Sequence, residues 1–71
     1  MDDSDRELLT GMGNCYDVCR EDFEETVRMV SSARGLTADI VKARLLRMRD
    51  EWGDTEAYQA LRARLPDDFP F

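Results

Sequence analysis

The sequence predicts an all-α fold, and two observations support this prediction. Apolar residues recur every three or four positions through most of the chain, whereas the strict alternation typical of a β-strand is almost absent. The only two prolines, Pro66 and Pro70, stand near the C-terminal end, so neither interrupts the preceding residues. We therefore expect one small helical domain over residues 1–71. It is a bundle of three main helices plus a short N-terminal helix, with non-helical ends at 1–4 and 66–71.

The short N-terminal helix is expected to begin directly after Ser4, which caps it. Ser4 and Glu7 have the spacing of a capping box, in which each side chain accepts a hydrogen bond from the other residue's backbone N–H. Gly11 and Gly13 adopt left-handed conformations at low cost, so the helix is expected to end there. Asn14 then suits the N-cap position of the next helix.

The second helix is expected to be the longest, running from about Cys15 to Arg34. Apolar residues at spacings of three and four draw one stripe along it, which we expect to face the core. Cys19 falls inside this stripe and Cys15 at its margin. The members of the stripe are Tyr16, Cys19, Phe23, Val27, Val30 and Ala33 or Arg34.

The third helix is expected to follow a turn at Gly35, with Thr37 as its N-cap. Gly53 is expected to end it. The residues that form its apolar face are Ile40, Val41, Leu45, Met48 and Trp52.

The fourth helix is expected to begin at Asp54 or Thr55 and to stop before Pro66. Its apolar stripe is made of Ala57, Tyr58, Leu61 and Leu65. The tail beyond it carries two aromatic residues, which a fully solvated tail has little reason to hold, so we expect the tail to pack against the protein.

The length and the ends of the sequence narrow the class of protein. A chain of 71 residues buries only about 60% of its unfolded surface, so its stability is marginal and a homodimer is among the expectations. The N-terminal segment is acidic where a signal peptide is basic, and no apolar run approaches the ~18 residues of a membrane span. We expect a soluble cytoplasmic protein that has no membrane partner and whose two cysteines stay reduced.

Catalysis and cofactor binding are not expected. The chain has no histidine and a single lysine, which removes the commonest general base and leaves few candidates for a nucleophile. Cys15 and Cys19, four residues apart on a helix, supply two of the four ligands of a zinc site, but there is no third cysteine and no histidine to complete it. The sequence therefore predicts a non-enzymatic protein without a metal or cofactor.

The charges are arranged in blocks along the chain. Residues 1–26 carry nine acids and two bases, residues 27–49 six bases and one acid, and residues 50–71 six acids and two bases, for a net charge of -6. The basic block lies mostly on the expected helix 38–51, after a short glycine-containing turn, as in a helix-turn-helix protein that reads DNA. The residues that would contact nucleic acid in this interpretation are Lys42, Arg44, Arg47 and Arg49. The alternative is that these bases are the solvated face of an amphipathic helix, or pair with the acidic first half of the second helix.

Protein binding is the function that the sequence favours. Separate acidic and basic blocks, four methionines and aromatic residues near an irregular C-terminal end are typical of a small acidic regulator or adaptor. The residues proposed for partner contact are Trp52, Phe69 and Phe71. The DNA-binding transcriptional regulator described above is the alternative, disfavoured by the net charge and by Asp39 at the start of the would-be recognition helix.

Overall fold

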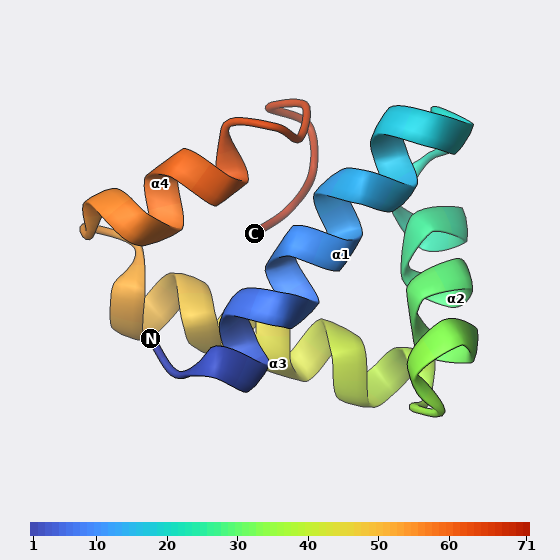
Figure 1. Ribbon diagram of the computed structural model, residues 1–71, viewed down its shortest axis with the longest axis horizontal. Coiled ribbons are helices and arrows are strands. Elements are labelled where there is room, and N and C mark those ends of the chain that lie inside the picture. Colours follow the sequence, from blue (N-terminus) through green and yellow to red (C-terminus); the bar gives the residue numbers. More distant parts are fainter.

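The computed structural model describes residues 1–71 as four α-helices and no strand, which confirms the all-α prediction (Figure 1). The helices are α1 (Asp3–Cys19), α2 (Phe23–Arg34), α3 (Ala38–Trp52) and α4 (Glu56–Arg62). Helix α1 crosses the middle of the molecule and packs against the other three, while α2 and α4 lie on opposite sides of it (Figure 1). None of the four combines the length and the apolarity that a membrane span requires.

The start of α1 differs from the prediction. Its N-cap is Asp2, whose carboxylate accepts a 2.8 Å hydrogen bond from the backbone N–H of Asp5. The predicted capping box at Ser4 and Glu7 is wrong, because Ser4 lies within the first turn. Its hydroxyl instead accepts a 2.6 Å hydrogen bond from Arg44 of α3. Helix α1 thus begins earlier than expected and is fixed to α3 from its first turn.

The predicted stop at Gly11 and Gly13 is also wrong. Both glycines, and Asn14 after them, are helical residues within α1, and Met12 between them is fully buried. A Cβ at Gly13 would lie 3.4 Å from the Arg64 side chain, so the missing side chain leaves room for the segment after α4 to pack closely on α1. The N-terminal helix is therefore the longest of the four.

The chain breaks instead at Arg20, inside the single helix predicted from Cys15 to Arg34. Arg20 is left-handed, with φ 55° and ψ 32°, and its N–H donates to the carbonyl of Tyr16 at 2.8 Å. Asp22 then caps α2 by accepting from the N–H three residues later at 2.8 Å. Both local contacts favour ending one helix and starting another, so α2 folds back alongside α1.

The remaining helix boundaries are close to the predictions. Gly35 ends α2 in the left-handed region, with φ 69°. Thr37 and Thr55 are the N-caps of α3 and α4, and each hydroxyl accepts from the N–H three residues later, at 3.2 and 3.3 Å. Helix α4 ends at Arg62, before Pro66, and Gly53 follows α3 as expected.

The core contains side chains from all four helices and from the tail. The expectation that the tail packs against the protein is confirmed: Phe69 and Phe71 are only 5% and 6% exposed. Two predicted core residues are placed differently, since Ile40 is 46% exposed and Cys19 does not pack on the core, whereas Cys15 does. Because the helix ends at Cys19, the predicted stripe does not continue from it into α2. The buried apolar residues are Leu8, Leu9, Met12, Val27, Val30, Val41, Leu45, Met48, Tyr58, Leu65, Phe69 and Phe71.

Arg62 holds the tail in this position. Its guanidinium donates hydrogen bonds to three backbone carbonyls, those of Leu65 at 3.0 Å, Phe69 at 3.0 Å and Phe71 at 2.6 Å. It also lies 5.2 Å from the centre of the Phe71 ring. The irregular tail thus obtains from one side chain the hydrogen bonds that a helix would supply from its backbone.

Candidate functional site

Two arginines of the basic helix point back onto α1. Arg44 and Arg47 both donate to the carboxylate of Asp5, with nitrogen–oxygen distances of 3.1–3.2 Å. Asp5 itself is 3% exposed, so this pair of arginines neutralises a buried negative charge. Both arginines therefore form ion pairs within the fold.

The other two bases of α3 also have partners within the chain. Lys42 pairs with Glu24 of α2 at 2.7 Å. Arg49 donates to the carbonyl of Pro70 at 2.9 Å and lies 3.5 Å from Asp50. All four residues proposed for nucleic-acid contact are thus hydrogen-bonded within the protein. This is the alternative considered from the sequence, although the acids involved lie mainly in α1 and at the start of α2.

The residues predicted for protein binding lie in or near the core. Trp52 is partly buried and packs against the core. Phe69 contacts two aromatic rings edge-on, with centroids 5.5 Å from Tyr16 and 5.6 Å from Phe23. Phe71 lies 5.7 Å from Phe23. The structure brings the two tail phenylalanines together with rings of α1 and α2, and leaves little of them for a partner to touch.

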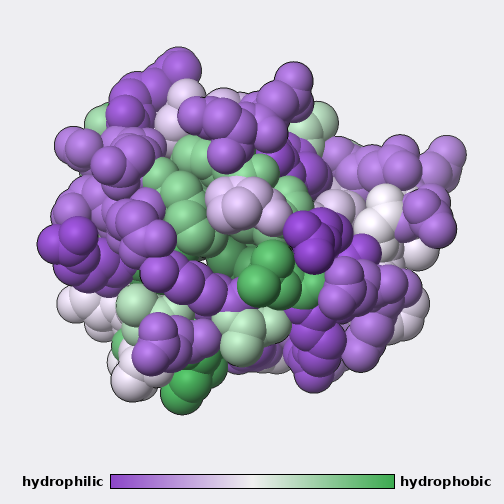
Figure 2. All heavy atoms as spheres, turned by 180° about the vertical axis from the view of Figure 1, so that it is seen from behind, coloured by the Kyte–Doolittle hydropathy of each residue, from purple (hydrophilic) through white to green (hydrophobic).

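Apolar surface is nevertheless present outside the core. Figure 2 shows a hydrophobic area in the middle of one face, surrounded by hydrophilic side chains. The large apolar residues with the greatest exposure are Val18 (83%), Ile40 (46%), Leu46 (41%) and Met29 (37%).

One apolar hollow lies between α3 and the tail, and we call it the α3–tail groove. Its volume is about 180 Å³. Leu46 is exposed at its edge and is not part of the apolar face predicted for the third helix, and this apolar residue off that face is the one sign of the groove in the sequence. The residues that line it are Phe23, Lys42, Leu45, Leu46, Pro70 and Phe71.

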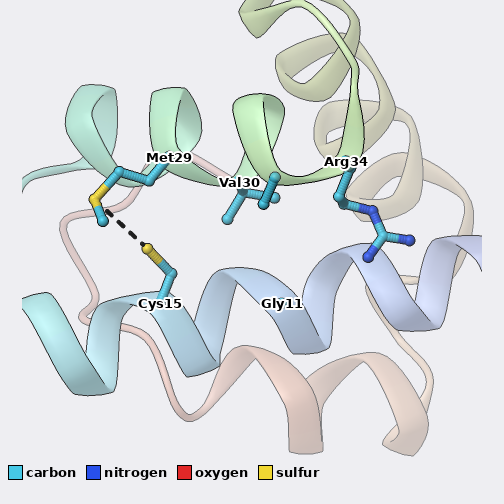
Figure 3. A pocket seen from close by; sticks show the side chains of 6 residues that line it. Gly11, Cys15, Met29, Val30 and Arg34 are labelled. Carbon is cyan, nitrogen blue, oxygen red and sulfur yellow. Dashed lines mark hydrogen bonds between the residues drawn. The ribbon is translucent and has the colours of Figure 1, made fainter.

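A second hollow lies between the antiparallel helices α1 and α2, and we call it the α1–α2 groove. Its volume is about 270 Å³ (Figure 3). It shares Gly11 and Arg34 with a neighbouring polar recess, in which Arg34 Nη2 lies 3.5 Å from Glu7 Oε2. The residues that line the α1–α2 groove are Gly11, Cys15, Met29, Val30, Ala33 and Arg34.

Sulfur atoms face each other across the α1–α2 groove. The Cys15 thiol donates a weak hydrogen bond to the thioether of Met29, with 3.9 Å between Sγ and Sδ (Figure 3). Burial raises the pKa of Cys15 above its usual value of 9.0, and the neighbouring Cys19 thiol and Glu25 raise it further. Both cysteines are free thiols. No three His, Cys, Asp or Glu side chains come close enough together to hold a metal ion by themselves.

Comparison with known proteins assigns no family, since no family model, curated protein or solved structure matches the chain. The features of the molecule that bear on its function are the two grooves and the charges around them.

Proposed function

We propose that this protein is a non-enzymatic regulator or adaptor that acts by binding another protein, and that the α3–tail groove receives the partner. The observation that carries the proposal is an apolar groove on the surface, with Leu46 41% exposed at its edge. Small-molecule pockets usually have volumes of about 300–1,000 Å³. A groove of about 180 Å³ suits a single apolar side chain that projects from a partner surface.

The charge of the protein supports a basic partner. The net charge is -6, and the bases of α3 are already paired with acids or carbonyls of the same chain. The unpaired charge that an approaching molecule meets is therefore mainly negative, which steers a positively charged partner toward the protein.

The proposal is tested with two aspartate substitutions of exposed apolar residues. Leu46→Asp places a charge at the edge of the α3–tail groove, and Val18→Asp places one on α1, at a residue that does not line this groove. A partner captured by the wild-type protein should also be captured by Val18→Asp and lost with Leu46→Asp. A photo-crosslinking residue at position 46, but not at position 18, should join the same partner covalently.

The proposal is contradicted if no stoichiometric partner is captured, or if both substitutions reduce capture equally. Circular dichroism melting of both variants checks that they remain folded. Sedimentation velocity tests whether the partner is a second copy: a wild-type homodimer that becomes monomeric only with Leu46→Asp would place the groove in a dimer interface.

DNA binding is the second candidate, because α2, the turn and α3 follow one another as in a helix-turn-helix unit (Figure 1). It requires the α3 bases to leave their present partners, at the cost of exposing the charge of Asp5. We expect no binding of mixed-sequence duplex DNA at ~50 mM salt, where phosphate contacts are strong. Binding with a steep salt dependence, reduced by Lys42→Ala, would favour this candidate over the first.

A further inference from the structure

Two sulfur atoms from two helices meet at the α1–α2 groove, and a third sulfur-bearing residue stands one helical turn from the first. Cys15 and Met29 face each other across the groove, and Cys19 follows Cys15 by one turn of α1 (Figure 3 shows the first two). We propose that Cys15, Cys19 and Met29 form a binding site for one Cu(I) ion. This inference is independent of the proposed partner groove, which lies between α3 and the tail.

The separation of two of the sulfurs already suits a three-coordinate ion. With metal–sulfur bonds of about 2.3 Å, two ligands of a planar trigonal site lie about 4.0 Å apart. Cys15 Sγ and Met29 Sδ are 3.9 Å apart. On a helix, side chains at positions i and i+4 have Cβ atoms about 5–6 Å apart, so rotation about the Cα–Cβ bond of Cys19 would bring its thiol toward the other two sulfurs when an ion binds.

The types of ligand favour Cu(I) over zinc. Thiolate and thioether sulfur are soft donors, which Cu(I) prefers, whereas a structural zinc site takes four ligands from cysteine, histidine and carboxylate groups. Here the third ligand is a methionine, no histidine exists in the chain, and no cluster of three zinc-type ligands is present. A site of two thiolates and one thioether is complete for Cu(I) but not for zinc.

The surroundings of the site allow an ion to enter. Met29 is 37% exposed and both cysteines are partly exposed, so the ligands can be reached from solvent. The groove around Cys15 and Met29 is lined mainly by apolar groups, such as Val30 and Ala33. Few water molecules would then compete with the sulfur ligands once the ion is bound.

Binding is an exchange of protons for the metal, without electron transfer. Each cysteine loses its proton to the buffer as its sulfur bonds to the ion, so two protons are released for each Cu(I). Copper stays in the +1 state, all three sulfurs stay reduced, and the two thiolates and the ion together carry a net charge of one negative unit.

The inference is tested by titrating the reduced protein with Cu(I) under anaerobic conditions against a chromophoric Cu(I) chelator. We expect one ion per chain and two protons released. Met29→Leu keeps an apolar side chain of similar size but removes the sulfur, and should lower the affinity about tenfold or more, a change of at least about 1.4 kcal/mol. Met48→Leu, in the core on α3, is the matched control and should bind as the wild type does.

Nuclear magnetic resonance of the methionine methyl groups gives a test on the wild-type protein, which does not depend on any variant folding. Adding one equivalent of Cu(I) should shift the Met29 methyl signal and leave that of Met48 in place. The inference is overturned if the Met29 signal does not move, if Met29→Leu binds Cu(I) as tightly as the wild type, or if Zn(II) displaces Cu(I) at equal concentration.

Discussion

At the scale of single residues, the most constrained charge is that of Asp5. Its carboxylate is 3% exposed and accepts hydrogen bonds from both Arg44 and Arg47, which fixes α3 across the start of α1. A buried carboxylate is stable only while such donors surround it, because burial removes its water. Neutralising this one side chain should therefore lower the stability of the fold. The loss is limited because both arginines are partly exposed and can bind water instead.

We expect Asp5→Asn to lower the free energy of unfolding by about 2 kcal/mol, as for the loss of charge-assisted hydrogen bonds. Urea denaturation measures this as a lower midpoint with an unchanged slope. Asp50→Asn is the matched control, since Asp50 is exposed and pairs with Arg49 only at the surface, at 3.5 Å. It should change stability by less than about 0.5 kcal/mol. Equal effects of the two substitutions would contradict the role given to Asp5.

Tyr58 provides a second prediction for a single residue. It is 4% exposed, and its buried hydroxyl has no hydrogen-bond partner. Burial raises the pKa of Tyr58 above its usual value of 10.0, while Arg62 and Arg49 lower it in part. The folded protein therefore holds this proton more tightly than the unfolded chain does. Its contribution to stability is fully present below pH 10 and is lost as the pH rises through the folded pKa.

Tyr58→Phe should remove this dependence of stability on pH and also the unpaired hydroxyl. At pH 7 we expect the free energy of unfolding to stay the same or rise by about 1 kcal/mol. Above pH 10 the variant should lose less stability than the wild type. Urea denaturation at pH 7, 9 and 10.5 measures both effects, and a variant that is less stable at pH 7 would show that the hydroxyl has a partner after all.

At the scale of the helices, residue preferences predicted the boundaries that depend on neighbouring residues. Thr37, Thr55 and Gly35 act as caps or stops because each makes its hydrogen bonds within a few positions. The helix stop predicted at Gly13 is wrong, because the glycine at this position makes room for Arg64, which lies far along the chain. Two glycines thus have different roles: Gly35 ends a helix, whereas Gly13 lies within one. Only tertiary packing distinguishes them.

The break at Arg20 was unpredictable for a related reason. The left-handed position after a helix usually holds glycine or asparagine, and arginine gives no such signal. In one continuous helix, Cys15 and Met29 would be 14 residues and therefore about 21 Å apart. The break brings their sulfurs to 3.9 Å. The sulfur site was consequently hidden in the sequence, where the two cysteines alone were too few ligands for a metal.

The corrected course of α1 can be tested at Gly11. Within a helix, Gly11→Ala should raise the free energy of unfolding by about 1 kcal/mol, because alanine has the higher helix propensity and its Cβ would meet nothing closer than 4.0 Å. Gly35→Ala is the opposite control. Because Gly35 has φ 69°, which is unfavourable for alanine, this substitution should lower the free energy of unfolding by about 1 kcal/mol. Thermal denaturation measures both. A destabilising Gly11→Ala would mean that the helix stops there, as the sequence first indicated.

At the scale of the whole molecule, the tail completes the core. Phe69 packs against rings from α1 and α2, and Arg62 holds the carbonyls around it. A domain of this size has a small margin of stability, so losing one such aromatic contact affects all four helices. The aromatic residues that the sequence marked as unusual in a tail are thus part of the interior.

We expect Phe69→Ala to cost about 3–5 kcal/mol, enough to unfold much of the protein at room temperature. Loss of dispersion in the proton NMR spectrum and of the cooperative urea transition would report it. Leu46→Ala is the control, because Leu46 is 41% exposed and should change stability much less. If Phe69→Ala remained as stable as Leu46→Ala, the tail would be packed on the surface and would not complete the core.

The position of Phe69 also affects how the protein is made. Tyr16 and Phe23 are synthesised about 50 residues before their aromatic partner, so at translation rates of about 5–20 residues per second they wait about 3–10 s for it. During that interval the nascent chain exposes an unfinished aromatic surface of the kind that chaperones bind. The aromatic cluster is therefore complete only once Phe69 has been made and has joined Tyr16 and Phe23.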